Sequence, residues 1–345
     1  MYVPMLFPIA KDYPPMEAQS ATALPTGPDW QYEPKWDGFR CLAFRDGKEV
    51  DLQSKAGKPL TRYFPELAAE IQKVKAQKCL LDGEIVIPFE GALSFDQLLM
   101  RIHPSSSRVE KLSRETPCIF IVFDLLVDAD GKSLVELTLD DRRKALERFA
   151  AKNFKSGGMI RLSPVTLELD TASKWFHMGV ALDGVVAKRS DLDYQSGKRS
   201  GMQKIKKMRS ADCVVGGFRY LEKKPLVGSL LLGLYNKAGT LDHVGFSSSI
   251  SAKDRPALTR KLKKLIKPPG FTGKAPGGPS RWSTKRSTEW EPLDGSLVAE
   301  VQFDHFTGGR FRHGTKLLRW RPDKSPEQCT QEQVQREDRS ALDLL

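Results

Sequence analysis

The chain has 345 residues, of which 40% are hydrophobic and 28% are charged; this composition is typical of a folded globular protein and excludes a disordered one. No apolar stretch reaches the roughly 18 residues that a membrane span requires, and the first residues lack the features of a secretory signal, so we expect a cytoplasmic protein. The five cysteines and five histidines show the spacing of neither a disulfide framework nor a zinc site. Carboxylates would have to hold any required metal, which favours magnesium or manganese.

The positive charge is concentrated in the last third of the chain, within a total net charge of +12. Residues 209–330 carry 22 basic and 11 acidic side chains, whereas residues 1–208 carry 31 and 28. Such an asymmetry indicates a module that binds a polyanion, because each phosphate that lysine or arginine neutralises releases counterions. A basic surface that only maintains solubility is the alternative that composition leaves open.

The first two thirds of the chain show both strand and helix patterns. Apolar and polar residues alternate from residue 30 to 52 around a turn at Asp46-Gly47, which predicts a hairpin with Lys35 on or just before a strand. Further along we expect a helix, two buried strands and a charged helix, at residues 63–74, 80–88, 118–127 and 140–149. The prediction is an α+β domain at residues 1–208, with antiparallel sheets and flanking helices.

Beyond residue 207 the pattern changes to short β-rich runs. We expect strands at residues 212–220, 226–235, 243–246 and 297–306, with a basic helix at residues 260–267. Several strands interrupted by one helix suit a small Greek-key barrel, so we predict an OB-fold β-barrel domain at residues 209–330. The polar residues 331–345 predict a disordered tail.

A series of short segments carries the ionisable side chains. The first is Lys35-Trp36-Asp37-Gly38, and the later ones are Leu81-Asp82-Gly83-Glu84, Phe123-Asp124, Leu182-Asp183-Gly184, Lys204-Ile205-Lys206 and Arg321-Pro322-Asp323-Lys324. A neutral lysine amine can attack the α-phosphorus of a nucleoside triphosphate and form a phosphoramidate. Because free lysine has a pKa of about 10.4, we expect desolvation and two neighbouring cations, Lys204 and Lys206, to lower the pKa of Lys35.

These ordered segments resemble those of the covalent nucleotidyltransferases, and in particular the bacterial ATP-dependent DNA ligases of the ligase C and ligase D catalytic-core type. The resemblance extends over nearly the whole chain and implies that residues 1–208 are an adenylation domain. It implies that Lys35 is the nucleophile that carries AMP, that Glu33 accepts the adenine amino proton and that Phe123 stacks on the base.

The same resemblance implies roles for the remaining polar residues. Arg40 and Glu84 would contact the ribose, and Lys55 would contact the nick or the ribose region. Asp183, which stands where the family often has glutamate, would bind Mg²⁺ or Mn²⁺ together with Glu84. The phosphates would contact Lys204 and Lys206, and the leaving pyrophosphate would be oriented by Arg321, Asp323 and Lys324.

The function that the resemblance implies is the sealing of 5′-phosphate/3′-hydroxyl nicks in duplex DNA with ATP. It implies a monomeric, nucleoid-associated enzyme, with repair or end-joining proteins such as Ku as partners and no membrane partner. Two alternatives stay open: an RNA-capping guanylyltransferase that uses GTP, and a non-catalytic nucleic-acid-binding relative. Glu33, as a hydrogen-bond acceptor, suits the adenine amino group better than guanine.

Overall fold

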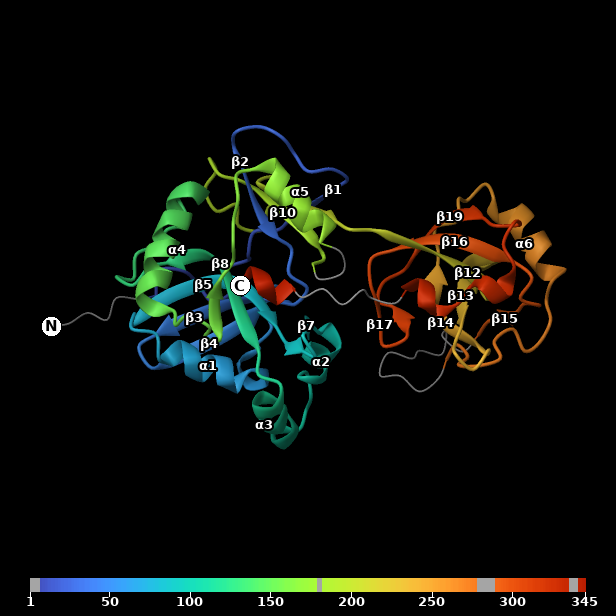
Figure 1. Cartoon of the computed structure of the whole chain (residues 1–345), viewed down its shortest axis with the longest axis horizontal. Helices are drawn as coiled ribbons and strands as arrows, with labels where there is room; N and C mark the ends of the chain where they lie inside the picture. Colours follow the sequence, from blue (N-terminus) through green and yellow to red (C-terminus); the bar gives the residue numbers. More distant parts are fainter. Residues whose placement is uncertain (1–6, 179–181, 278–288, 335–340) are drawn as a thin grey trace. The chain divides into compact units, whose positions relative to one another are not determined.

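The computed structural model describes residues 7–178, 182–277, 289–334 and 341–345 of the chain. The chain divides into two compact units (Figure 1). The first unit comprises Met1–Lys207 together with Glu337–Leu345, and the second comprises Met208–Arg336. No helix in the described ranges is long and apolar enough to cross a membrane.

Two β-sheets form the framework of the first unit. The larger has five strands in the order β4-β3-β5-β8-β9, at Glu49–Ser54, Phe39–Asp46, Lys78–Val86, Ile119–Val127 and Ile160–Leu162. The other has four strands in the order β1-β11-β10-β2, at Gln19–Ala21, Met202–Lys206, Gly184–Arg189 and Trp30–Pro34. A short separate hairpin joins β6 to β7, at Pro88–Phe89 and Ala92–Leu93.

The helices of the first unit pack around these sheets. They are α1 to α5, at Pro65–Gln72, Phe95–Met100, Ser106–Glu115, Leu139–Asn153 and Leu169–His177. The helix predicted at residues 63–74 is confirmed as α1, with Pro65 in its first turn, where the missing N–H needs no partner. The charged helix, predicted at residues 140–149, is longer: it begins at Leu139, where the Thr138 side chain caps it by accepting from the Asp141 N–H, and it continues to Asn153.

The hairpin prediction at residues 30–52 is only partly right. β3 and β4 do pair around the turn at Asp46-Gly47, but residues 30–34 form β2 in the other sheet. The alternation of apolar and polar residues could not show that residues 30–34 belong to a different sheet, because strands of both sheets have the same alternation. Residues 35–38, the crossing segment, therefore pass from one sheet to the other. A Cβ on Gly38 would lie 2.2 Å from the carbonyl oxygen of Ile85, so this passage requires glycine.

The second unit is an antiparallel sheet in a Greek-key order. Its strands run β14-β13-β12-β16-β19, with β15 also paired to β12, at Leu241–Ser247, Lys224–Tyr235, Arg209–Leu221, Val298–Phe303, Lys316–Trp320 and Glu291–Pro292. β12 to β14 form a meander and β16 returns beside β12, as a Greek key requires. In the described residues the outer strands β14 and β19 do not pair as a ladder, and an isolated bridge joins Ser247 to Thr315. The barrel is thus an open one, with bulges in the long β12 and β13 strands.

The helix of the second unit and the end of the chain differ from prediction. Helix α6 spans Arg255–Lys263, earlier than residues 260–267, because Pro256 fits its first turn. The predicted tail is not uniformly disordered: Gln331–Val334 form the 3-10 helix η4 and Ala341–Leu344 form η5. Val334 and Ala341 are both buried, so isolated apolar residues anchor a polar sequence. Residues 335–340 lie outside the described residues.

The crossing segment yields a test of the fold. Gly38→Ala should lower the free energy of unfolding by about 1–3 kcal/mol, because its methyl group would force Ile85 and the neighbouring side chains to shift. Denaturant unfolding would measure this change. Gly157→Asn is the matched control, because its backbone is in the left-handed region that asparagine tolerates and a Cβ there meets no atom within 4 Å. Equal stability of the two variants would contradict the close approach at Gly38.

Candidate functional site

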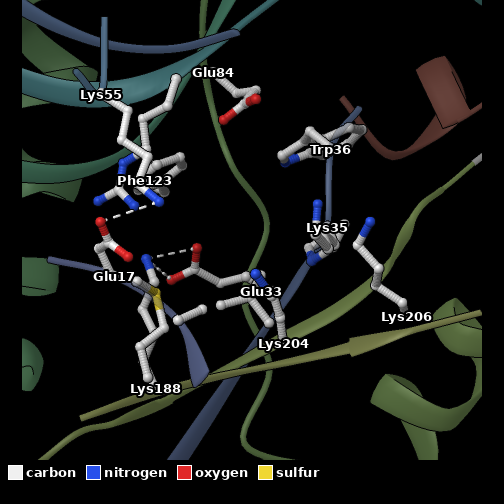
Figure 2. Close-up of a pocket in the computed structure, with 15 residues that line it drawn as sticks. Glu17, Glu33, Lys35, Trp36, Lys55, Glu84, Phe123, Lys188, Lys204 and Lys206 are labelled. Atoms are coloured by element: carbon white, nitrogen blue, oxygen red, sulfur yellow. Dashed lines mark hydrogen bonds and ion pairs between the residues drawn. The ribbon is translucent and has the colours of Figure 1, made fainter. Parts of the chain in front are cut away.

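A pocket in the first unit brings most of the predicted nucleotide-binding residues together (Figure 2). The cavity has a volume of about 260 Å³ and is lined by side chains from both sheets. The predicted residues that line it are Glu33, Lys35, Arg40, Lys55, Glu84, Phe123, Lys204 and Lys206. Asp183 contacts Lys35, whereas Arg321, Asp323 and Lys324 belong to the second unit.

Lys35 is fixed at this pocket by its backbone and by its side chain. Its N–H donates to the carbonyl of Gly184 over 3.0 Å, and its carbonyl accepts from the N–H of Asp183 over 2.9 Å. Its ammonium group forms an ion pair with the Asp183 carboxylate, which is buried. Gly184 is required beside them, because its φ is +133° and a Cβ there would lie 2.0 Å from the carbonyl oxygen of Ile205. Strands β2, β10 and β11 thus hold the lysine in place.

The pKa of Lys35 is shifted in the direction opposite to the predicted one. Burial is the largest single influence and lowers it, but the charge and hydrogen bond of the Asp183 carboxylate, together with the charges of Glu84 and Asp37, outweigh burial, so the pKa lies above its ordinary value. The pKa of Lys204 is lowered, first by burial and then by the positive charge of Lys35. The sequence shows the nearby cations but not the carboxylate that faces Lys35. The lysine is therefore an ammonium ion here and must lose a proton before it can attack.

Arg40 and Glu84 face each other on the paired strands β3 and β5. The Arg40 guanidinium donates to both oxygens of the fully buried Asp82, over 2.9 and 2.6 Å, and this fork fixes its position. Burial raises the pKa of Glu84 to about 8, although the positive charges of Lys35 and Arg40 oppose the shift. A cation or hydroxyl donor beside Glu84 would stabilise its ionised form. Asp82 was not among the predicted site residues.

Lys188 is a further pocket residue that the sequence prediction missed, and Gln31 behind the pocket contacts the same carboxylate as Lys188 does. The Lys188 Nζ lies 2.8 and 2.9 Å from the two carboxylate oxygens of Glu33, and the Gln31 amide donates to one of them over 2.9 Å. Lys188 Nζ also lies 4.3 Å from the centre of the Phe123 ring. Lys188 alternates with the pocket residue Val186 along β10, so the period of a strand could have found it. This end of the pocket combines an aromatic ring with hydrogen-bond donors and acceptors, which suits a purine base.

The opposite part of the pocket is rich in lysine. Lys204 and Lys206 lie two residues apart on β11 and line the same cavity, as predicted from their alternation. The Lys206 Nζ lies 3.7 Å from Asp183. Together with Lys35, these two cations provide a site for a chain of phosphates. The Lys55 Nζ lies 3.2 Å from Glu17, and Figure 2 shows both residues on the side of Phe123 and Lys188.

The three predicted residues of the second unit form a network of their own. Arg321 donates to Asp212 over 2.9 Å and to Asp323 over 2.8 Å, while the Lys324 Nζ lies 3.0 Å from Asp212. The pKa of Asp323 falls to about 2 because Arg321 donates hydrogen bonds to it. These residues follow β19 directly, and Asp212 on β12 pairs with both Arg321 and Lys324.

The carboxylates of the pocket could supply part of the ligands of a metal ion, with a bound substrate supplying the others. Among the described residues, no cluster of three or more His, Cys, Asp and Glu side chains forms a complete metal site. Asp183 and Glu84 are both among the carboxylates whose charge acts on Lys35. Magnesium is commonly held by one or two carboxylates plus substrate phosphates and water. These two residues fit such a partial set of ligands.

Comparisons with known proteins identify both parts of the chain. A family model described as ATP dependent DNA ligase domain matches residues 10–206, and one described as ATP dependent DNA ligase C terminal region matches residues 223–324. The chain is 42% identical to DNA ligase C2 of Mycolicibacterium smegmatis, over 96% of this chain and 95% of that protein. It is 32% identical to the multifunctional non-homologous end joining protein LigD of Mycobacterium bovis, over 88% of this chain and 37% of that longer protein.

A solved structure shares the fold. The structure comes from a structure-function study of Lig E DNA ligases, and it aligns with a TM-score of 0.55 at 17% identity, over 89% of this chain and 99% of that one. The match to the ligase C-terminal region and the Greek-key order together identify the second unit as an OB-fold domain. With both regions matched and a relative aligned over nearly its whole length, the chain belongs to the ATP-dependent DNA ligases.

Proposed function

We propose that Lys35 carries AMP from ATP to the 5′-phosphate of a nick in duplex DNA, and that the other pocket residues hold the nucleotide around it. The chain is an ATP-dependent DNA ligase by family. The assignment of roles to residues is supported above all by the position of Lys35. It lies in one pocket with a base-binding end, at Glu33 and Phe123, and with the lysines of β11.

In the first step the Lys35 amine attacks the α-phosphorus of ATP. A nitrogen–phosphorus bond forms, the bond from the α-phosphorus to the bridging oxygen breaks, and pyrophosphate leaves. Asp183 is the carboxylate in contact with Lys35 and is the nearest acceptor for the proton that the ammonium must first lose. Lys204 and Lys206 would balance the charge of the triphosphate. A magnesium or manganese ion held by Asp183 and Glu84 would supply further neutralisation of phosphate charge.

The later steps return Lys35 to its first state. An oxygen of the DNA 5′-phosphate attacks the phosphorus of the lysyl-AMP, the nitrogen–phosphorus bond breaks, and Lys35 takes up a proton. The 3′-hydroxyl then attacks the 5′-phosphorus, and AMP leaves as the strand is joined. Each step is an in-line displacement, so catalysis depends on positioning and on charge neutralisation.

Recognition of the nucleotide would divide between the two sheets. Glu33 can only accept hydrogen bonds and would accept from the adenine amino group, while the base stacks on Phe123. Arg40 and Glu84 would contact the ribose, and Lys55 would contact the ribose or the nick. Guanine presents an oxo group where adenine presents the amino group, so a carboxylate at this position disfavours GTP.

The second unit would act on both substrates. Arg321, Asp323 and Lys324 would orient the leaving pyrophosphate, and the basic side chains of residues 209–330 would bind the DNA backbone. Serving first ATP and then DNA requires the second unit to change its position about the junction at residues 207 and 208. The protein would act as a monomer.

The covalent step has a direct test. Incubation with α-labelled ATP and magnesium should label the protein, because the phosphoramidate retains the α-phosphate, and Lys35→Ala should abolish the label. Lys152→Ala, at an exposed position near the end of α4, is the matched control and should be labelled like the wild type. Nicked duplex DNA should then remove the label. Labelling by GTP and not by ATP would instead indicate a capping-type enzyme, and no labelling at all would indicate a non-catalytic relative.

If the second unit binds DNA and the pocket of the first unit binds ATP, DNA binding and self-adenylylation should differ in their dependence on salt. Raising the salt concentration from about 50 to 200 mM should weaken DNA binding on the order of a thousandfold, because many phosphate contacts release counterions. Self-adenylylation in the same buffers should change much less, since the lysines that serve it lie inside the pocket. Binding isotherms and single-turnover labelling would measure the two effects. Equal salt sensitivity would count against DNA binding by the basic surface of the second unit.

We infer a role in DNA repair from the similarity to the LigD protein, whose name refers to non-homologous end joining. A partnership with Ku would follow from such a role. A panel of nicked, gapped and blunt-ended duplexes, with and without Ku, would distinguish nick sealing from end joining. Faster joining of blunt ends in the presence of Ku would support the partnership, and unchanged joining would argue against it.

A further inference from the structure

Arg40 belongs to a closed ring of hydrogen bonds beside the nucleotide pocket. Its Nη2 donates to Asp82 Oδ2 over 2.6 Å, and the Tyr194 hydroxyl donates to the same oxygen over 2.7 Å. That hydroxyl accepts from the Met16 N–H over 3.0 Å, and the Met16 carbonyl accepts from Arg40 Nη1 over 2.8 Å. The ring therefore joins β3 and β5 to the segment before β1 and to the loop between β10 and β11.

Tyr194 is itself fixed from several directions. It is 5% exposed, and its ring stacks on that of Tyr13 with 6.1 Å between the ring centres. The guanidinium carbon of Arg142 lies 5.4 Å from the centre of the Tyr194 ring, and Arg142 donates to both oxygens of the buried Asp124. Burial, and then the charge of Asp82, raise the pKa of the Tyr194 phenol well above its ordinary value. The hydroxyl therefore keeps its proton and remains a donor to Asp82.

The hydrogen-bond ring restricts what Arg40 can offer to a ligand. A guanidinium has five N–H groups in a planar fork. Arg40 uses three of them in bonds of 2.6 to 2.9 Å, to both oxygens of Asp82 and to the Met16 carbonyl. A ligand in the pocket can bind only to the remaining donors, and the same bonds set their directions. The guanidinium carbon also lies 5.2 Å from the centre of the Phe123 ring, so a rotation of Arg40 would disturb that contact.

We propose that Tyr194 is a positioning residue of the nucleotide site, because its hydroxyl joins the two groups that orient Arg40 toward the ribose. Those groups are the Asp82 carboxylate and the backbone of Met16. Without the hydroxyl, the carboxylate loses a donor and the Met16 N–H loses its acceptor. The Met16 carbonyl is then no longer held where it accepts from Arg40. The inference rests on the proposed contact between Arg40 and the ribose, and it adds the residue that fixes this contact.

The test removes one hydroxyl and measures recognition of the ribose. Tyr194→Phe keeps the ring beside Arg142 and deletes only the oxygen that closes the hydrogen-bond ring. Tyr13→Phe is the matched control, because it deletes the same group from the stacked neighbour, whose hydroxyl has no hydrogen-bond partner among the described residues. Single-turnover self-adenylylation with ATP, 2′-deoxy-ATP and 3′-deoxy-ATP gives a half-saturating concentration and a maximal rate for each nucleotide.

In the wild type and in Tyr13→Phe, loss of the ribose hydroxyl that Arg40 contacts should raise the half-saturating concentration about tenfold, because a charged donor loses its acceptor. In Tyr194→Phe, the half-saturating ATP concentration should rise about threefold to tenfold, and the penalty for the deoxynucleotide should shrink to about threefold or less. The maximal rate should change less than about twofold, since a contact of equal strength in the ground and transition states affects binding alone. A Tyr194→Phe variant that keeps the full ribose penalty would overturn the inference, whatever its stability.

A second measurement uses the wild-type protein and does not depend on the folding of a variant. If the bond between Met16 and Tyr194 helps Arg40 to hold the ribose, a bound ribose must in turn stabilise that bond. Saturating AMP should therefore slow hydrogen exchange at the Met16 amide about threefold or more relative to saturating 2′-deoxy-AMP or 3′-deoxy-AMP, whichever lacks the contacted hydroxyl. Equal protection by all three nucleotides would count against Tyr194 as a positioning residue.

Failure of the proposed function would look different from failure of this inference. If neither deoxynucleotide differs from ATP in the wild type, the ribose contact of Arg40 is wrong and the role of Tyr194 falls with it. Labelling of Lys35 by ATP would be unaffected by that result. If the wild type and Tyr194→Phe discriminate equally against the deoxynucleotide, the ribose contact stands and only the role of Tyr194 is overturned.

Discussion

The ion pair between Lys35 and Asp183 organises the pocket. Lys35 follows β2 and Asp183 precedes β10, and two backbone hydrogen bonds join the same pair of segments. The crossing segment then leads from this junction into β3, which carries Arg40 to the other side of the cavity. Because both sheets meet at this junction, a shift of Lys35 would move the lysine-rich end relative to Arg40 and Glu84. One connection thus positions both the proposed nucleophile and the residues proposed to contact the nucleotide.

The same ion pair sets the chemical problem that the enzyme has to solve. Asp183 raises the pKa of Lys35 against the effect of burial, so the proposed nucleophile is held as an ammonium ion. In the proposed reaction Asp183 would become neutral when it takes up the proton of Lys35; once the proton is passed on, the buried carboxylate would be an unpaired charge, which is costly. Lys206 lies 3.7 Å from Asp183 and would then be a second positive partner for it. A divalent cation with the triphosphate would do the same to a greater degree.

How much the sequence predicts depends on the range of the interaction. Local patterns predict α1, the β3-β4 hairpin and the shared face of Lys204 and Lys206, because each depends on neighbours within a few residues. The ordered motifs also indicate which side chains meet in the pocket. What they miss is contact between distant segments. The pairing of Lys188 with Glu33 spans two strands that are far apart in sequence, and the direction of the Lys35 pKa shift depends on a carboxylate 148 positions away.

The anchored end of the chain illustrates the same limit. A polar composition indicates disorder, yet the segments on either side of residues 335–340 each place a buried apolar residue, Val334 or Ala341, in a core cluster, and Leu344 and Leu345 pack beside Ala341. No periodic pattern marks such a contact, because it uses one or two residues and depends on a surface formed elsewhere in the chain. The boundaries of α6 show the same limit to a smaller degree. The run of basic residues predicted the C-terminal half of the helix but not its first turn, which begins at Arg255.

Carboxylates hold several of the cations in and around the proposed phosphate sites of both units. Asp183 pairs with Lys35 and Lys206, and Glu17 with Lys55 and Arg199; in the second unit Asp212 pairs with Arg321 and Lys324. A phosphate that arrives at any of these sites exchanges one ion pair for another, so the gain in free energy is smaller than for an unpaired cation. In return, the side chains are already positioned and need not be ordered at the moment of binding. This favours an enzyme that must bind ATP and then a phosphorylated nick, and must release pyrophosphate, AMP and the joined DNA, because no single contact holds its phosphate too tightly for the next step.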